Sequence, residues 1–195
     1  MTTPKAGRPR DVDRDRALLV ATGDLLAEVG YDRLTIDAVA GRCSAGKATV
    51  YRRWPSKAEL VADAVALLHD SYDAPDTGDL REDLIAMAEQ WHDLDARRDA
   101  VIAGLLTAMA HDEPLRTAVQ TAISQPRHAC YRAVVDRAIA DGQLSPDLDV
   151  DLIGAVFPAL TFHQITVRAE PVDRSLIERI VDHLVLPALT RPNAP

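Results

Sequence analysis

The chain has 195 residues, of which 47% are hydrophobic, 27% are charged and 4% are aromatic, and its net charge at pH 7 is −8. This composition excludes wholesale disorder, and the scarcity of aromatic residues and of extended β-branched runs disfavours a β-sandwich or barrel and favours helices. No run of 18 apolar residues occurs and no apolar stretch follows the basic N-terminus, so we expect a cytoplasmic protein without a membrane span or secretory signal.

The first third of the sequence predicts four helices. Apolar residues recur at steps of three and four from Ala17 to Val29, and Gly30 is placed to end this first helix. Thr35 can cap a short second helix that ends near residues 42–44. A third helix is expected over about residues 46–54, and a Ser56-to-Glu59 capping box opens a fourth.

The rest of the chain predicts further helices, for a total of about nine to ten. A loop is expected over residues 69–79, followed by an apolar stripe from Leu80 to Leu94 and another from Val101 to Met109. Pro114 is placed to begin a helix, and Pro126 is placed to begin or kink another. Two long helices are expected last, at about 149–168 and 173–189, although residues 160–167 alternate in a way that would also suit a strand.

Three short helices with a four-residue turn before the third have the outline of a helix–turn–helix unit. Residues 30–40 (Gly-Tyr-Asp-Arg-Leu-Thr-Ile-Asp-Ala-Val-Ala) and 44–60, with a Lys-x-Thr-x-Tyr helix and a Trp-Pro-Ser-Lys junction, resemble the DNA-binding domain of the TetR family of transcriptional regulators. The resemblance covers about residues 8–65. It implies an all-α protein with a flexible basic arm (1–10), a helix–turn–helix DNA-binding domain (11–70) and a helical ligand-binding and dimerisation domain (71–195).

The third helix is expected to enter the major groove of double-stranded operator DNA by its N-terminal end. Lys47 can donate to guanine, and the methyl groups of Ala48 and Thr49 can meet thymine, although Lys47 could also bind a phosphate or stay solvated. By resemblance Tyr51 binds a phosphate, with packing on the first helix as the alternative. The other DNA-binding candidates are Arg52, the helix-start residues Thr35 and Lys57, and Arg8 and Arg10, whose arm either reaches the minor groove or is a disordered tail.

Two residues depart from the pattern of the family in this region. Ser44 stands where the turn usually has Gly, so the left-handed conformation there is either strained or altered. Gly46 stands where the third helix usually has a Ser-like cap, which costs only a few tenths of a kcal/mol. Both bear on how the third helix is aimed.

The charge of the sequence is unevenly distributed. Residues 1–60 carry 11 Lys and Arg against 8 Asp and Glu, whereas the remaining residues carry 11 against 22. A weakly basic head on an acidic body is consistent with a head that meets a polyanion.

The resemblance implies a homodimer formed by the last two helices. Their apolar surface exceeds what one core-facing stripe would use, which favours an interface over a single-chain core. Pro158 and Pro187 are expected to bend or end these helices. The interface candidates are Ile153, Val156, Leu160, Ile177, Ile180, Val181 and Leu184.

The resemblance also implies a small-molecule effector held by the central helices. Large aromatic side chains dominate apolar binding sites, and Trp adds a polar group, so Trp91 and Phe162 are the first choices. Most of the candidates could equally be ordinary core. The full set is Met87, Trp91, Leu105, Met109, Tyr131, Phe157, Phe162 and His163.

We therefore expect a ligand-responsive repressor that leaves a palindromic operator when its effector binds, with an effector-independent regulator or an activator as alternatives. A small all-helical enzyme is a distant alternative, because the sequence has no Gly-rich phosphate loop and no nucleophile placed with a His and a carboxylate. No cofactor or metal is expected. The segments 69–70 and 111–113 do not match helix-face metal spacing, and Cys43 and Cys130 are expected to be reduced thiols.

Overall fold

The computed structural model describes residues 9–67, 73–91 and 96–191, apart from the side chains of residues 9–11, 96–100, 102 and 103. All regular elements in these ranges are helices, including residues 160–166, for which a strand was the alternative. The chain forms two compact units, one made of residues 1–68 and 104–122 and the other of residues 69–103 and 123–195. The first unit thus includes a second segment that the sequence analysis placed in the C-terminal domain.

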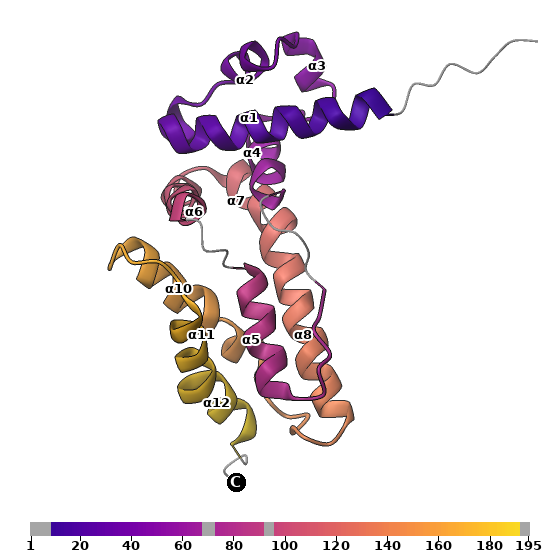
Figure 1. The fold of residues 1–195 in the computed structure, drawn as a ribbon, viewed down its shortest axis with the longest axis vertical. Helices are drawn as coiled ribbons and strands as arrows, with labels where there is room; N and C mark the ends of the chain where they lie inside the picture. The colour runs from indigo at the N-terminus through magenta and orange to yellow at the C-terminus, as the bar shows by residue number, and fades with distance from the viewer. Residues whose placement is uncertain (1–8, 68–72, 92–95, 192–195) are drawn as a thin grey trace, which may run out of the picture. The chain divides into compact units, whose positions relative to one another are not determined.

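The first unit is built around a long first helix, α1 (Pro9–Arg33), which changes direction at Gly30 with φ 76° and ψ 170°. This positive φ is accessible to Gly without steric penalty, so the regular part of the helix ends where the sequence predicted. Three shorter helices follow, with α2 and α4 against α1 and α3 beside α2 (Figure 1). They are α2 (Ile36–Arg42), α3 (Lys47–Tyr51) and α4 (Lys57–Ala66).

The predicted caps define where α2 and α4 begin. The Thr35 hydroxyl accepts a hydrogen bond from the Ala38 N–H at 3.2 Å, and the Ser56 hydroxyl accepts one from the Glu59 N–H at 3.1 Å. Each hydroxyl satisfies a backbone donor that the first helical turn leaves without a partner. These local bonds explain why the boundaries of both helices could be predicted from the sequence.

The second segment of the first unit contains the end of α6 (Ala96–Met109) and all of α7 (Glu113–Val119). Helix α7 packs against α4 and buries Leu115 and Val119. Asp112 caps α7 by accepting from the Leu115 N–H at 2.9 Å, and its other carboxylate oxygen accepts from the Tyr31 hydroxyl at 2.9 Å. A side-chain bond therefore joins α7 to the end of α1.

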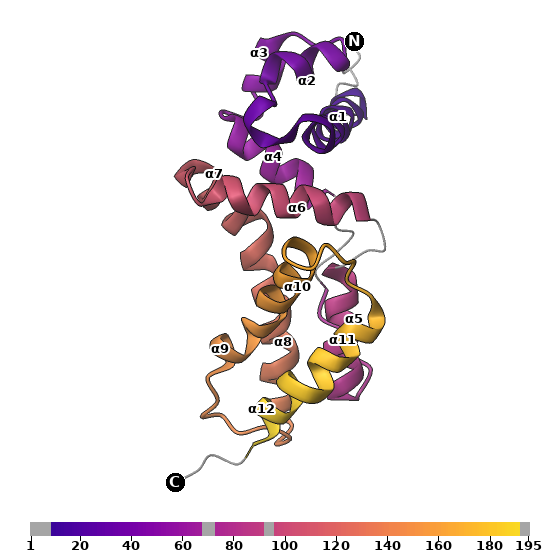
Figure 2. The ribbon, with the colours of Figure 1, turned by 90° about the vertical axis from the view of Figure 1, so that its left-hand side faces the viewer.

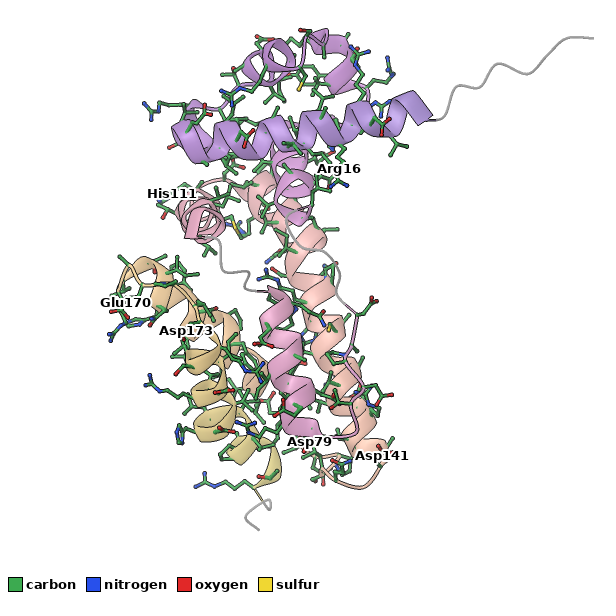
Figure 3. The ribbon with its side chains drawn as sticks, viewed as in Figure 1. Arg16, Asp79, His111, Asp141, Glu170 and Asp173 are labelled. Atoms are coloured by element: carbon green, nitrogen blue, oxygen red, sulfur yellow. The ribbon has the colours of Figure 1, made fainter. Side chains whose placement is uncertain are left out.

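The second unit packs its helices around α5 and α8, which lie side by side (Figures 1 and 2). Its core is a continuous cluster that includes Leu84, Met87 and Val135. Asp79 and Asp173, labelled in Figure 3, accept from the N–H groups of Glu82 at 3.1 Å and Leu176 at 2.8 Å in the first turns of α5 and α11. The helices are α5 (Leu80–Trp91), α8 (Gln125–Ala140), α9 (Val150–Gly154), α10 (Val156–Thr166), α11 (Arg174–Ile180) and α12 (Leu186–Thr190).

Pro158 and Pro187 explain why the two long predicted helices are divided, and Pro126 lies in the first turn of α8. Proline cannot donate to the carbonyl four residues earlier, and its ring clashes with that carbonyl. Pro126 follows a π-helical turn at Gln120–Ser124, and Pro187 follows another at Val181–Val185. Pro158 lies just after the break between α9 and α10 at Ala155. In each case a widened or broken turn removes the conflict.

The structure corrects part of the predicted dimer face. Ile177, Ile180 and Val181 are buried in the core of the second unit of a single chain, so they are not part of an exposed face. The apolar residues of α11 and of the π-helical turn after it pack instead against other helices of the same chain. Leu184 is 45% exposed, and Ile153, Val156 and Leu160 are partly buried against the same core.

Within the described ranges, no helix combines the length and the apolar character that crossing a bilayer requires.

Candidate functional site

The turn between α2 and α3 has the left-handed residue that a helix–turn–helix needs. Ser44 adopts φ 50°, and the Ala45 N–H donates to the Ala40 carbonyl at 2.8 Å across the turn. A non-glycine residue pays a steric cost for this conformation, so Ser44 holds the expected geometry with strain. Gly46 then caps α3 without a side-chain hydrogen bond.

The inner side of α3 is anchored in the core of the first unit. Val50 is fully buried, and Trp54, just beyond the helix, is buried with its indole N–H donating to the Asp63 carboxylate at 2.8 Å. Val39 of α2 is also fully buried. A five-residue helix is unstable alone, so this tertiary packing holds α3 in place.

The outer side of α3 carries the side chains predicted to contact DNA. Tyr51 is 44% exposed, which disfavours the alternative that it packs on α1. Thr49 is half-buried, and Lys47, Ala48 and Arg52 are exposed. The helix therefore presents cationic, hydroxyl and methyl groups on one open face.

Lys47 has a partner that sequence reasoning missed. Its ammonium lies 2.9 Å from the Asp37 carboxylate of α2 and 5.9 Å from the centre of the Tyr51 ring. The hydrogen bond to Asp37 raises the pKa of Lys47. Because both groups of this ion pair are exposed to solvent, Lys47 can exchange Asp37 for a nucleic-acid acceptor at little cost.

Lys57 is more deeply engaged than the sequence suggested. Its ammonium donates to the Tyr31 carbonyl at 2.8 Å and lies 4.1 Å from the centre of the Tyr31 ring. This contact closes the turn after Gly30 and uses one of the three ammonium donors. Thr35 is exposed at the start of α2. Arg8 and the side chain of Arg10 lie outside the described residues.

Two further ion pairs hold the helices of the first unit together. Arg42 of α2 forms two hydrogen bonds with Glu28 of α1, at 3.0 and 2.8 Å. Arg53, after α3, pairs with Asp15 of α1. Arg42 and Arg53 therefore hold helices together. The sequence alone could not distinguish them from Arg52, which is exposed, because all three carry the same charge.

The second unit contains a cavity of about 290 Å³ between α5, α8, α9 and α10. Trp91 and Tyr131, two of the predicted ligand-binding residues, both line it. The other lining residues were not predicted, although residues of α8 and of α9–α10 recur there at helical spacing. The lining is Trp91, Ser124, Arg127, His128, Tyr131, Asp151, Gly154, Ala155, Pro158 and Thr161.

The remaining ligand-binding candidates lie elsewhere. Phe162 is 42% exposed and His163 is exposed, and neither is among the residues that line this cavity. Met87 is fully buried in the core, and Phe157 packs edge-on against Trp91 with ring centres 6.1 Å apart. The other two candidates, Leu105 and Met109, belong to the first unit.

The first unit has a larger hollow of about 620 Å³ between α4 and α7. Glu59, Asp63 and Glu113 line it, together with Trp54 and Thr117. The Trp54 indole already donates to Asp63. The polar group of the one large aromatic residue in this lining is therefore already hydrogen-bonded within the unit.

Two of the residues considered as metal ligands, His111 and Asp112, lie just before the start of α7. Asp112 caps α7, and His111 is exposed after the end of α6 (Figure 3). Cys43 and Cys130 are free thiols in different units. No three His, Cys, Asp or Glu side chains gather as a metal site among the described residues, and residues 69–70 lie outside them.

Both halves of the chain match known protein families. The family model for bacterial regulatory proteins of the tetR family matches residues 18–64, and that for the tetracyclin repressor-like C-terminal domain matches residues 74–184. The chain belongs to the TetR family. The TetR assignment accounts for the helix–turn–helix in the first unit and the helical second unit.

Individual TetR relatives match over nearly the whole chain. A DNA-binding transcriptional repressor TetR of Mycobacteroides abscessus is 37% identical over 192 residues, covering 95% of this chain and 98% of the relative. An uncharacterised HTH-type transcriptional regulator of Mycobacterium tuberculosis is 34% identical, with 97% and 96% covered. The crystal structure of a TetR family transcription regulator matches with a TM-score of 0.71 and 30% identity over 89% of this chain and 97% of that one.

Proposed function

We propose that this TetR-family protein is a transcriptional repressor that binds operator DNA as a homodimer and is released by a small-molecule effector. The observation that carries the proposal is the open face of α3, where Lys47, Ala48, Tyr51 and Arg52 are exposed on a helix anchored from behind by Val50. The name of the M. abscessus relative, a DNA-binding transcriptional repressor, supports the same role.

The face of α3 suits the major groove. Lys47 at its N-terminal end can leave Asp37 and donate to guanine acceptors, while Ala48 and Thr49 offer methyl groups to thymine. Tyr51 and Arg52, one turn further on, are suited to phosphate oxygens. In a symmetric dimer the two α3 helices would read half-sites about 34–36 Å apart.

The second unit has apolar residues suited to self-association. Phe162 and Leu184 are 42% and 45% exposed, on α10 and in the π-helical turn after α11, and Val156 and Leu160 are only partly buried. Large apolar side chains in contact with water favour burial against a second copy. We infer that these residues, with Ile153, form the dimer face.

Effector response requires a connection between the cavity and the DNA-binding helices. Helix α7 packs on α4 and is tied to α1 by the Tyr31–Asp112 bond. The chain runs from α7 through the π-helical turn at Gln120–Ser124 directly into α8, and Ser124, which ends the turn, and Arg127, in the first turn of α8, both line the cavity. An effector with unequal affinity for two positions of α8 would shift α7, and a coupling of about 1–3 kcal/mol would weaken DNA binding roughly 5- to 150-fold.

The DNA-binding part of the proposal is tested with duplexes from the region upstream of the gene that encodes the chain. We expect affinity to fall steeply with salt, with a log–log slope of about −0.9 for each phosphate neutralised. Tyr51→Phe should weaken all duplexes alike, whereas Lys47→Ala should change sequence preference. Arg191→Ala, which removes a charge outside the first unit, should do neither.

A full-length dimer that binds none of these duplexes at low salt contradicts the proposal. So does a salt response no steeper than that of an unrelated acidic protein. If Lys47→Ala weakens every duplex equally, Lys47 is a phosphate contact and the sequence is read elsewhere.

A further inference from the structure

We propose that Asp37 is a specificity-determining residue that accepts a hydrogen bond from the amino group of a cytosine, while Lys47 donates to the guanine paired with that cytosine. The inference rests on the proposed function, because it takes DNA as the partner of α3. It goes further by giving α2 a contact with a base and by naming the base pair that the two residues read together.

Asp37 and Lys47 present an acceptor and a donor side by side. The ammonium of Lys47, the first residue of α3, lies 2.9 Å from the carboxylate of Asp37, in the first turn of α2. The two side chains are 53% exposed for Lys47 and 65% exposed for Asp37, so neither is enclosed by the core. A base edge that the Lys47 ammonium reaches is therefore also close to the Asp37 carboxylate.

A carboxylate at this place has a cost that a base contact would remove. The phosphates of a bound duplex repel Asp37 and have no proton to donate to it. When Lys47 turns to a guanine, Asp37 also loses the cation that offsets its charge in the free protein. The bases offer two kinds of donor in the major groove, the amino groups of cytosine and of adenine. Asp37 therefore favours a duplex that places such a group beside the guanine.

A G·C pair fits the two side chains best. Its guanine offers Lys47 two acceptors, N7 and O6, and its cytosine offers Asp37 an amino donor with no acceptor beside it in the groove. In an A·T pair the adenine amino group lies next to N7, which repels a carboxylate, and thymine offers Lys47 one acceptor instead of two. Reversal to C·G brings the carboxylate against N7 and O6. The two residues together therefore distinguish the base pair and its orientation.

Asp37 also has a role in the free protein, which the test must separate from base recognition. Negative charge in the first turn stabilises a helix whatever the surface contacts. Glu113 is likewise an exposed acidic residue in the first turn of a seven-residue helix of the first unit, α7. Glu113→Gln is thus the matched control for Asp37→Asn, because each removes one such charge and Asp37 is the one paired with Lys47.

The test selects duplexes from a random library with the full-length protein and then measures the affinity for each of the four base pairs at every selected position. We expect the wild type to select a G·C pair in each half-site and to bind its C·G reversal about tenfold more weakly. Asp37→Asn should select adenine in place of that cytosine, because an Asn amide pairs with both N6 and N7 of adenine. Glu113→Gln should select the wild-type sequence.

Asp37→Ala gives a second measurement, because its side chain neither accepts nor donates. It should bring the affinities for G·C and C·G at this position closer together without selecting adenine. The proposal is overturned if Asp37→Asn selects the wild-type sequence. It is also overturned if both Asp37 variants bind every duplex more tightly by the same factor, since Asp37 would then act only by repelling phosphates.

The same selection distinguishes this inference from the proposed function. A wild-type protein that selects no sequence contradicts the proposed function, and this inference with it. A wild-type protein that selects a palindromic sequence, together with an Asp37→Asn variant that selects the same one, contradicts this inference alone.

Discussion

The candidate functional residues are exposed in the first unit and buried in the second. In the first unit the candidate DNA contacts on α3 point outward, and the residues behind them, such as Val50, are fully buried. In the second unit the candidate ligand contacts, Trp91 and Tyr131, are themselves buried, and the indole nitrogen of one and the hydroxyl of the other have no hydrogen-bond partner in the described part of the chain. Exposed residues that contact DNA can be substituted without changing the packing of the core. Residues that line a ligand cavity are themselves part of the core.

This contrast has an energetic consequence. Substitutions on the outer face of α3 should change DNA affinity and leave the free energy of unfolding nearly unchanged, because exposed side chains contribute little to it. Substitutions in the cavity should change both quantities, since an open and partly unsatisfied site reduces stability. The second unit must offset this cost with strong contacts elsewhere.

The largest expected effect concerns one of those contacts. Asp83 is buried on α5 and pairs with Arg137 of α8 at 3.0 Å, and it also accepts from the Thr77 hydroxyl and N–H, both at 2.7 Å. Arg137→Ala leaves a buried carboxylate without its cation, so we expect a loss of about 3 kcal/mol in the free energy of unfolding, measured by urea denaturation.

Arg132→Ala is the matched control, because Arg132 lies on the same helix and pairs with Asp136 in solvent. It should cost no more than about 1 kcal/mol. Equal losses for the two variants would show that the Asp83 pair is not what offsets the cost of the cavity.

Two glycine-to-alanine variants, one in each unit, should change the free energy of unfolding in opposite directions. Gly154→Ala places a Cβ against the Tyr131 ring, 2.5 Å from Cε1, so we expect a loss of about 1–3 kcal/mol from overpacking. Gly23→Ala in α1 meets nothing within 4 Å and should stabilise by about 0.5–1 kcal/mol. Thermal unfolding of both variants is the measurement, and a stabilising Gly154→Ala would mean that the Tyr131 ring moves freely.

Two tyrosine-to-phenylalanine variants should have opposite effects. Tyr31→Phe removes the bond to the Asp112 carboxylate at 2.9 Å and should cost about 1–2 kcal/mol. Tyr131→Phe removes a buried hydroxyl that has no partner among the described residues and should be neutral or stabilising by up to about 1 kcal/mol in the absence of ligand. A destabilised Tyr131→Phe would contradict an unsatisfied cavity.

The smallest expected effect is a dependence on pH. The hydrogen bond from Arg81 lowers the pKa of Asp182 below its ordinary value of 3.8. A lowered pKa in the folded state stabilises the protein above the unfolded pKa, and this contribution is lost as the pH falls through the folded value. We expect stability measured by urea denaturation to drop below about pH 4, and Arg81→Gln to reduce that drop while Arg191→Gln leaves it intact.

Sequence reasoning succeeded where the determinants are local. Gly30 ends the regular part of α1, Thr35 and Ser56 cap the next helices, and Ser44 takes the left-handed position, because each acts within a few residues of itself. It failed where a residue's partner is distant in sequence. Lys47 is paired with Asp37 across two helices, and Lys57 closes the turn after Gly30 by contacting Tyr31.

The same limit explains the errors in the second unit. Apolar periodicity shows that a helix has a face to bury but not what covers it, so Ile177, Ile180 and Val181 were assigned to a dimer and proved to be core. The polar lining of the cavity, including Arg127 and Asp151, gives no apolar signal.

The amino-acid order alone determined that the chain is helical and where the second, third and fourth helices begin, since propensity, capping and turn conformation act over a few residues. Tertiary structure alone decided which aromatic side chains enclose a cavity and which acidic groups neutralise which arginines. Those outcomes depend on contacts between residues far apart in the chain, such as Tyr31 with Asp112 and Asp83 with Arg137, which no local pattern specifies.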